Sequence, residues 1–248
     1  MLSSVNPDYL RVGQKRKALR AVNLIKLKRS RKLKIRMCDN GAPSCQFVPR
    51  KEVKSPTITI EGLLVTMMID AYADIKVEIF DPPGAYLQTD LPKDKFTLLL
   101  LEGKFVDIMC DINTEYKHQV RFKHGRKILY ICILKAIYGI IESDLIWYEL
   151  YMSVLKNMGF QLNPYDMCVA NKDINRKQCT VSWYVYDNKV SHVEQDVIDD
   201  IIRMLEERFL GLTVTNGNVQ TFSGTKIRYL NNRRISINIY SYTTEAVQ

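Results

Sequence analysis

The most informative stretch of this 248-residue chain reads Val181-Ser182-Trp183-Tyr184-Val185-Tyr186-Asp187-Asn188-Lys189-Val190-Ser191. Apolar residues occupy both ends of the stretch, and a short polar segment around Asp187 separates them. Two strand-like runs joined by a tight polar turn are typical of a β-hairpin. The sequence therefore predicts a hairpin, which is either an ordinary surface hairpin or one whose turn carries a carboxylate into a site.

A second carboxylate follows a strand-like segment earlier in the chain. Residues 75–80 alternate as in a half-buried strand, and the chain continues as Phe80-Asp81-Pro82-Pro83-Gly84-Ala85-Tyr86-Leu87. A strand end can fix a carboxylate rigidly, and two such carboxylates on neighbouring strands can hold Mg²⁺ together with substrate phosphates. An Asp-Pro-Pro-Gly string is also an ordinary turn. Asp81 becomes a metal-ligand candidate only if the hairpin turn lies beside it.

Helical and strand-like segments alternate along the rest of the chain. Helices are predicted at residues 61–73, 144–158 and 192–209, and the last is opened by the capping-box pattern Ser191-His192-Val193-Glu194. Strands are predicted at residues 96–101, 128–133, 179–185, 219–222, 226–230 and 234–239, with the last two joined as a hairpin. This pattern indicates an α+β fold.

Positive charge is concentrated at the N-terminus. Residues 1–54 contain 15 Lys/Arg and 3 Asp/Glu, whereas the remainder contains 21 and 24. An excess of this size attracts polyanions through phosphate contacts and counterion release, so nucleic acid is the leading partner and an anionic membrane surface the second. A solvated basic tail without a partner is the alternative. With turn signals at Asn40-Gly41 and Pro43 and a boundary at Ser55-Pro56, the pattern predicts a basic arm over 1–54 and a folded body over 55–248.

The cysteines and the apolar runs exclude several classes of protein. Six cysteines are scattered without a CxxC pair, and only three histidines are present, which argues against a zinc site. The sequence contains no apolar run of about 18 residues and no signal-peptide layout. We therefore expect an intracellular protein, cytoplasmic or nuclear, with reduced thiols and no membrane span.

The order of these pieces resembles the reverse transcriptase domain of copia-type LTR retrotransposons over most of residues 36–240. The landmarks that carry the resemblance are Arg36-Met37-Cys38, Ser55-Pro56-Thr57, Asp81-Pro82-Pro83-Gly84-Ala85-Tyr86, Leu101-Glu102-Gly103-Lys104-Phe105, Leu134-Lys135-Ala136-Ile137-Tyr138-Gly139, Trp147-Tyr148, Met158-Gly159-Phe160 and Asp166 with Cys168. Any one of these strings is weak evidence. Together, in this order, they are specific.

The resemblance implies a fold and a set of roles. The fold is a right-hand polymerase palm, an antiparallel sheet backed by helices, with partial fingers and an end before a full thumb. Asp81 and Asp187 are implied as Mg²⁺ ligands for nucleotidyl transfer to a primer on an RNA or DNA template, using deoxynucleotides. Tyr86 is implied as the steric gate against a 2′-hydroxyl, and Tyr138 with Gly139 as nucleotide and template contacts.

This copy departs from the family pattern at the hairpin turn. The family reads Tyr-Val-Asp-Asp, whereas this chain reads Tyr184-Val185-Tyr186-Asp187, so Tyr186 stands where the family has a metal-binding Asp. Phe222-Ser223-Gly224-Thr225 likewise replaces the family's Phe-Leu-Gly-Met. Two carboxylates bind Mg²⁺ more weakly than three. We therefore expect an impaired RNA-directed DNA polymerase, with an inactive nucleic-acid-binding remnant or a host-adopted scaffold as alternatives. The stretch Val106–Gly125 suggests no role.

Overall fold

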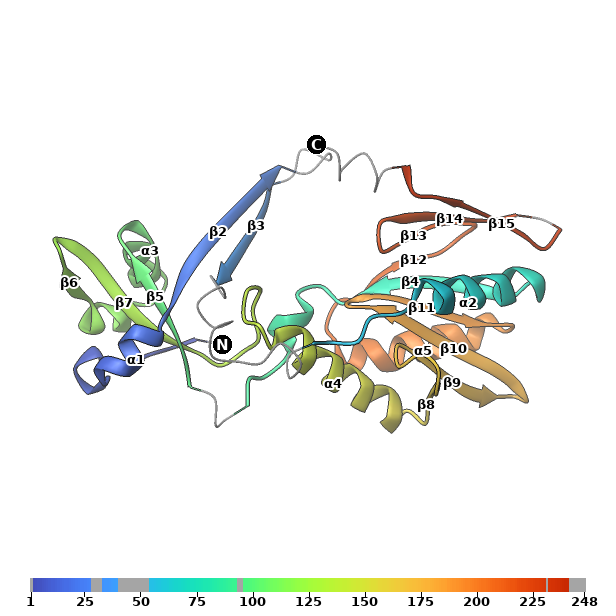
Figure 1. Cartoon of the computed structure of the whole chain (residues 1–248), viewed down its shortest axis with the longest axis horizontal. Coiled ribbons are helices and arrows are strands. Elements are labelled where there is room, and N and C mark those ends of the chain that lie inside the picture. The colour runs from blue at the N-terminus through green and yellow to red at the C-terminus, as the bar shows by residue number, and fades with distance from the viewer. Residues whose placement is uncertain (1, 28–32, 40–53, 93–95, 231, 241–248) are drawn as a thin grey trace. The chain divides into compact units, whose positions relative to one another are not determined.

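The structure is a computed structural model of the chain, and it describes residues 2–27, 33–39, 54–92, 96–230 and 232–240. The chain forms two compact units (Figure 1). Unit 1 comprises Met1–Lys54 and Tyr86–Trp147, and unit 2 comprises Ser55–Ala85 and Tyr148–Gln248. Both units combine helices with largely antiparallel strands, so the predicted α+β class is confirmed. The turn signals at Asn40-Gly41 and Pro43 lie outside the described residues.

Unit 1 is built on a sheet with the strand order β1-β7-β5-β2-β3, in which β6 also pairs with β7. Its strands are β1 (Leu2–Ser4), β2 (Leu19–Leu27), β3 (Leu33–Asp39), β5 (Thr97–Glu102), β6 (Arg121–Lys123) and β7 (Arg126–Ile133). The β2–β5 pair is parallel and the other pairs are antiparallel. Residues 1–54, expected as a basic arm or partial fingers, thus contribute three strands to this sheet.

Helical segments cover both faces of the unit 1 sheet. On one face, Leu10 follows the short turn η1 (Pro7–Tyr9), precedes α1 (Val12–Lys17), and packs with Leu98, Leu100, Ile128 and Tyr130. On the other face, α3 (Lys104–Ile112) packs against β5 and β7, and the turn η5 (Thr114–Gln119) leads from α3 to β6. The stretch Val106–Gly125 therefore forms most of α3, η5 and β6.

Unit 2 contains an antiparallel sheet with the strand order β12-β4-β11-β10-β9-β8. A second sheet has the order β13-β14-β15. The strands of the two sheets are β4 (Lys76–Asp81), β8 (Gln161–Leu162), β9 (Val169–Ile174), β10 (Lys177–Tyr184), β11 (Asp187–His192), β12 (Thr213–Thr215), β13 (Val219–Phe222), β14 (Thr225–Leu230) and β15 (Arg234–Asn238).

Three helices complete unit 2, namely α2 (Ile60–Tyr72), the part of α4 (Ser143–Asn157) from Tyr148 onward, and α5 (Gln195–Arg208). The ring of Tyr151 on α4 lies 5.4 Å from the ring of Trp183 on β10 and 5.9 Å from that of Phe209, measured between centroids. These rings are fully or almost fully buried. They join α4 and the end of α5 to one face of the main sheet, where large aromatic surfaces provide much of the packing energy.

Most of the predicted helices and strands are confirmed to within a few residues. The predicted hairpin over residues 181–191 is formed by β10 and β11, and the predicted hairpin across residues 231–233 by β14 and β15. None of the helices in the described ranges is long and apolar enough to cross a bilayer.

The predicted start of the helix at His192 is wrong. Helix α5 begins at Gln195, and Ser191 and His192 belong to β11, where they pair with Val77 and Lys76 of β4. The side chain of Glu194, the residue before the helix, makes no capping bond. Instead, the Glu194 backbone N–H donates to Nδ1 of His192 at 3.1 Å. Strand pairing on both sides of β11 overrides the local capping-box pattern.

Candidate active site

Asp81 ends strand β4. Val77, Ile79 and Phe80 are buried in the sheet, and Asp81 is half-buried at its rim. The next residue is Pro82, which has no backbone N–H and cannot extend the ladder. The backbone of Asp81 is held between neighbours, because β12 pairs with β4 at Thr213 opposite Asp81. A carboxylate is thus fixed at the end of a rigid strand.

Asp187 begins strand β11, directly after a two-residue turn. Tyr184 pairs with Asp187, so Val185 and Tyr186 form the turn itself. Val185 has φ of +57°. Only the first turn residue lies in the left-handed region, which matches a type II′ hairpin, a turn that normally has Gly at this position. A β-branched residue there is strained, and strain of this kind concentrates at functional sites.

The register of β4 and β11 brings the two carboxylates together. Asn188 pairs with Phe80, and the next residues outward on the two antiparallel strands are Asp187 and Asp81. The Cα atoms of directly opposed antiparallel residues lie about 4.5–5.5 Å apart. Since side chains alternate along a strand, both carboxylates leave the same face of the sheet.

The carboxylate of Asp187 is held in a poorly hydrated position. Its Oδ2 accepts a hydrogen bond from the backbone N–H of Ser223 at 3.1 Å, in the turn between β13 and β14. Burial raises the pKa of Asp187 above its ordinary value, and the Ser223 hydrogen bond opposes part of that rise. A bound cation would favour the charged form. A cation bound next to Asp187 would therefore stabilise the ionised form of its carboxylate.

Asn188, which sequence reasoning missed, holds the turn in place. Its side chain is fully buried, and its Nδ2 donates to the carbonyl of Tyr186 at 2.6 Å and to that of Phe80 at 3.3 Å. One amide thus connects the turn to the end of β4, immediately before Asp81. An Asn directly after a predicted tight turn, beside a candidate metal-binding carboxylate, is the signal that could have identified it.

Beneath the two carboxylates lies a buried ion pair that the sequence analysis also missed. Lys189 of β11 pairs with Asp70 of α2, and the two side chains are 0% and 3% exposed. Lys189 lies two residues beyond Asp187 and so shares its face of the sheet. Burial raises the pKa of Tyr229, and the negative charge of Asp70 raises it further. The pair anchors α2 to this face.

The other predicted site residues, Tyr86, Tyr138 and Gly139, lie together in unit 1. Tyr86 is buried, its hydroxyl donates to the carboxylate of Asp144, and its ring meets that of Tyr138 edge-on at 4.7 Å. Gly139 has φ of +98°, and Ile140 N–H donates to Ile137 O at 3.3 Å, as expected for a type II turn. Asp81 and Asp187 form one cluster and these three residues another.

Asp166, one of the landmarks of the resemblance, makes three hydrogen bonds within unit 2. Its Oδ2 accepts from the N–H and the hydroxyl of Thr59, at 2.9 and 2.8 Å, and its Oδ1 accepts from the N–H of Cys168 at 2.9 Å. Thr59 is in turn the N-cap of α2 and accepts from Gly62 N–H. Asp166 therefore fixes the start of the helix that precedes β4, which is a structural role.

The donor set fits one hard cation better than two. Asp81 and Asp187 offer carboxylate oxygens on adjacent strand ends, and Mg²⁺ is commonly held by one or two carboxylates with substrate phosphates completing its shell. Across the described part of the chain, no three His, Cys, Asp or Glu side chains gather closely enough to form a metal site. The position next to Asp187 in the turn is occupied by the phenol of Tyr186. A third carboxylate is missing there.

The structure of the chain is similar to solved polymerase structures at low identity. It matches a foamy viral protease-reverse transcriptase in complex with ds DNA (TM-score 0.47, 13% identity, covering 86% of this chain and 30% of that chain). It also matches apo telomerase from Candida tropicalis (TM-score 0.47, 11% identity, covering 96% of this chain and 57% of that chain). A third match is telomerase from Candida albicans in complex with a fragment of telomeric RNA (TM-score 0.46, 8% identity, covering 95% of this chain and 48% of that chain). The chain thus spans 30–57% of the length of these proteins. No protein-family model and no curated protein sequence matches it.

Proposed function

We propose that this chain is a copia-type reverse transcriptase module, a palm with partial fingers, whose nucleotidyl-transfer centre is impaired. The observation that carries the proposal is the β4–β11 register, in which Asp81 follows Phe80 opposite Asp187 at the tip of a two-residue hairpin. The motif order in the sequence supports the same reading. The partners are a template-primer of RNA or DNA and deoxynucleotides.

The proposed chemistry assigns each residue a separate task. Asp81 and Asp187 hold Mg²⁺, which when bound activates a primer 3′-hydroxyl and neutralises the leaving pyrophosphate. Tyr86 excludes the 2′-hydroxyl of a ribonucleotide. Its packing against Tyr138 and its bond to Asp144 support this role, since a gate must keep one rotamer. Tyr138 and Gly139 contact the nucleotide or the template.

A second candidate, an inactive nucleic-acid-binding remnant, is favoured by two observations at the hairpin. Tyr186 removes one charged ligand, and the raised pKa of Asp187 makes the remaining carboxylate costly to ionise without a cation. A barrier raised by even several kcal/mol slows a reaction roughly a thousandfold or more. The two candidates share the partner and differ in turnover.

Metal titration of Tyr186→Asp tests the proposal. The substitution restores a carboxylate beside Asp187 at a half-buried hairpin tip, and ligand charge sets affinity for hard cations. Isothermal titration calorimetry should show Mg²⁺ binding strengthened by roughly tenfold or more. Tyr165→Asp is the matched control, because Tyr165 is 95% exposed and the charge change is identical. Asp81→Asn in the Tyr186→Asp background should abolish the gain.

Primer extension on an RNA template separates the two candidates. The unmodified chain should extend at or near background, and Tyr186→Asp should be necessary for any recovery. Unchanged Mg²⁺ affinity in Tyr186→Asp would overturn the assignment of the site, and robust extension by the unmodified chain would overturn its impairment.

A further inference from the structure

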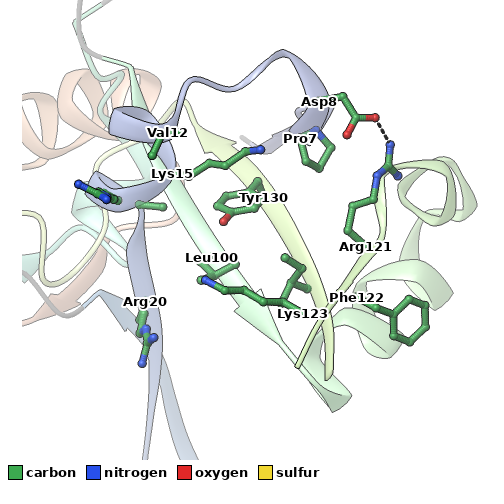
Figure 2. A pocket seen from close by; sticks show the side chains of 13 residues that line it. Pro7, Asp8, Val12, Lys15, Arg20, Leu100, Arg121, Phe122, Lys123 and Tyr130 are labelled. Carbon is green, nitrogen blue, oxygen red and sulfur yellow. Dashed lines mark hydrogen bonds and ion pairs between the residues drawn. The ribbon is translucent and has the colours of Figure 1, made fainter. Parts of the chain in front are cut away.

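A basic pocket belongs to unit 1, whereas Asp81 and Asp187 belong to unit 2. It has a volume of about 550 Å³, within the ~300–1,000 Å³ typical of ligand sites, and its rim contains Lys15, Arg16, Arg20, Arg121 and Lys123. Figure 2 shows Lys15 and Arg20 on the N-terminal segments, with Arg121 and Lys123 on β6 across the ring of Tyr130. Segments that are about a hundred residues apart in sequence thus form one cationic rim.

Local structure explains why the β6 cations reach this rim. Lys123 pairs with Arg126, so His124 and Gly125 form a two-residue turn, and both have positive φ, at +49° and +74°. This is a type I′ turn, whose twist suits a tight hairpin. Arg121 and Lys123 are two residues apart on β6, so their side chains leave the same face of the strand.

The single acidic side chain on the lining is already neutralised. Asp8 pairs with Arg121 at 2.6 Å, and the same guanidinium also donates to the carbonyls of His118 and Val120. The excess positive charge of the lining therefore comes from Lys15, Arg16, Arg20 and Lys123, because Asp8 is the one acidic residue that lines the pocket. A rim of this charge complements phosphate.

The floor of the pocket is apolar, apart from one hydroxyl. Leu100, Ile128 and Tyr130 form it from neighbouring strands β5 and β7. Burial and the nearby charge of Glu102 raise the pKa of Tyr130, so its hydroxyl keeps its proton and can donate. A cationic rim above an apolar floor matches a nucleotide, which has a phosphate at one end and a flat base at the other.

We propose that this basic pocket binds a nucleotide within a single-stranded nucleic acid, with phosphates on Arg20, Lys15 and Lys123 and the base over the Leu100–Tyr130 floor. A strand suits it better than a free nucleotide, because exposed positive charge continues past the rim at Lys17 and Arg126. A single strand also leaves its bases unpaired, so that one of them can enter the pocket. The proposal rests on the proposed nucleic-acid partner and gives the stretch Val106–Gly125 a role.

Binding of labelled oligo(U) in EDTA tests the pocket, with Arg20→Ala/Lys123→Ala as the test variant. Removal of two phosphate contacts should lower the slope of log K against log salt by about 1.4 and weaken binding about 25-fold near 0.1 M salt, taking 1 M salt as the reference. Lys104→Ala/Arg176→Ala is the matched control. It removes the same charge from exposed positions off the pocket, and should bind like the unmodified chain.

Photo-crosslinking with 5-iodouridine gives a second readout that does not depend on folding of a variant. Crosslinks should map to residues 12–20 and 121–130. Equal losses in the test and control variants, or crosslinks confined to other segments, would overturn the pocket. So would equal affinity for a blunt duplex, for ATP, or for phosphatidylserine-rich vesicles. EDTA removes Mg²⁺, so this result is independent of the metal titration that tests Asp81 and Asp187.

Discussion

The buried pair of Asp70 and Lys189 allows a sharp test of how unit 2 is held together. With side chains 3% and 0% exposed, neither charge reaches water. Lys189→Met should leave the carboxylate of Asp70 buried without its partner charge, and Asp70→Leu should leave the ammonium of Lys189 buried without its partner charge. Removal of one partner from a buried pair costs about 3–5 kcal/mol, whereas replacement of both by apolar groups is neutral or stabilising by up to about 4 kcal/mol.

These costs are large on the scale of the molecule. A loss of about 3–5 kcal/mol is roughly a fifth or more of a typical folding free energy of about 5–15 kcal/mol, and it should lower Tm by roughly 6–20 °C for a chain of this size. The double variant Asp70→Leu/Lys189→Met should recover most or all of the loss. The coupling energy should therefore exceed the ~3 kcal/mol upper range of ordinary contacts.

Urea unfolding followed by tryptophan fluorescence measures these differences, because Trp183 is buried in the same sheet as Lys189. Lys127→Met is the control. Its partner Asp107 lies at 2.5 Å, but the two side chains are 45% and 52% exposed, so solvent screening should leave the free energy of unfolding almost unchanged. The reasoning fails if both single variants at the buried pair are as mild as this control, or if the double variant is as unstable as the sum of the singles.

Three further outcomes follow from other parts of the structure. Gly62→Ala should destabilise the protein by roughly 1–3 kcal/mol, because the new Cβ would collide with Oδ2 of Asp166, whereas Gly13→Ala meets nothing within 4 Å and should be neutral or stabilising by up to about 1 kcal/mol in thermal unfolding. Asp187→Asn should raise the free energy of unfolding at neutral pH. Because burial raises the folded-state pKa of Asp187 above 3.8, the stability that Asp187 contributes is greatest below pH 3.8 and is lost as the pH rises through the folded-state pKa. Urea titrations should therefore show that Asp187→Asn stabilises the protein at neutral pH and not at acidic pH. Burial raises the pKa of the Cys168 and Cys179 thiols to about 12, so neither should react with a disulfide reagent at neutral pH until the protein unfolds; fast labelling of either in the native state would contradict the burial.

Local patterns in the sequence were enough to locate most helices and strands. The apolar spacing of residues 61–73 and the alternation of residues 75–80 predicted α2 and β4 to within a residue or two. The hairpin at Asp187 was also predictable, because its turn and both strands are contiguous. The pairing of that hairpin with β4 required the family resemblance, since more than a hundred residues separate Asp81 from Asp187 in the sequence.

Long-range polar contacts were beyond the reach of the sequence. Lys189 is a charged residue in a strand, and without the partner Asp70 it suggests an exposed edge. The same holds for Asp166, whose match to a family string gave no hint that it holds Thr59. The basic pocket was not predicted, because Arg121 and Lys123 belong to the stretch Val106–Gly125, whose sequence suggests no role. The cations of residues 1–54 were interpreted as a basic arm. The helix start predicted from the capping-box pattern at Ser191 was wrong for the opposite reason, because long-range strand pairing of β11 overrode a local helix signal.

The interleaving of the two units affects how the protein is made. Thr59 is synthesised 107 residues before its hydrogen-bond partner Asp166. The carbonyl of Val77 accepts a hydrogen bond from Nε2 of Gln220, which is synthesised 143 residues later. At about 5–20 residues per second, synthesis leaves β4 without this partner for roughly 7–30 s. During that time the unpaired backbone groups along the edges of β4 can pair with other chains. Residues 86–147 emerge in the interval and can complete the sheet of unit 1 first. Unit 1 can therefore fold while unit 2 is still incomplete, and we expect the yield of folded protein to depend on chaperones that hold unfolded chains as well as on the stability of the final fold.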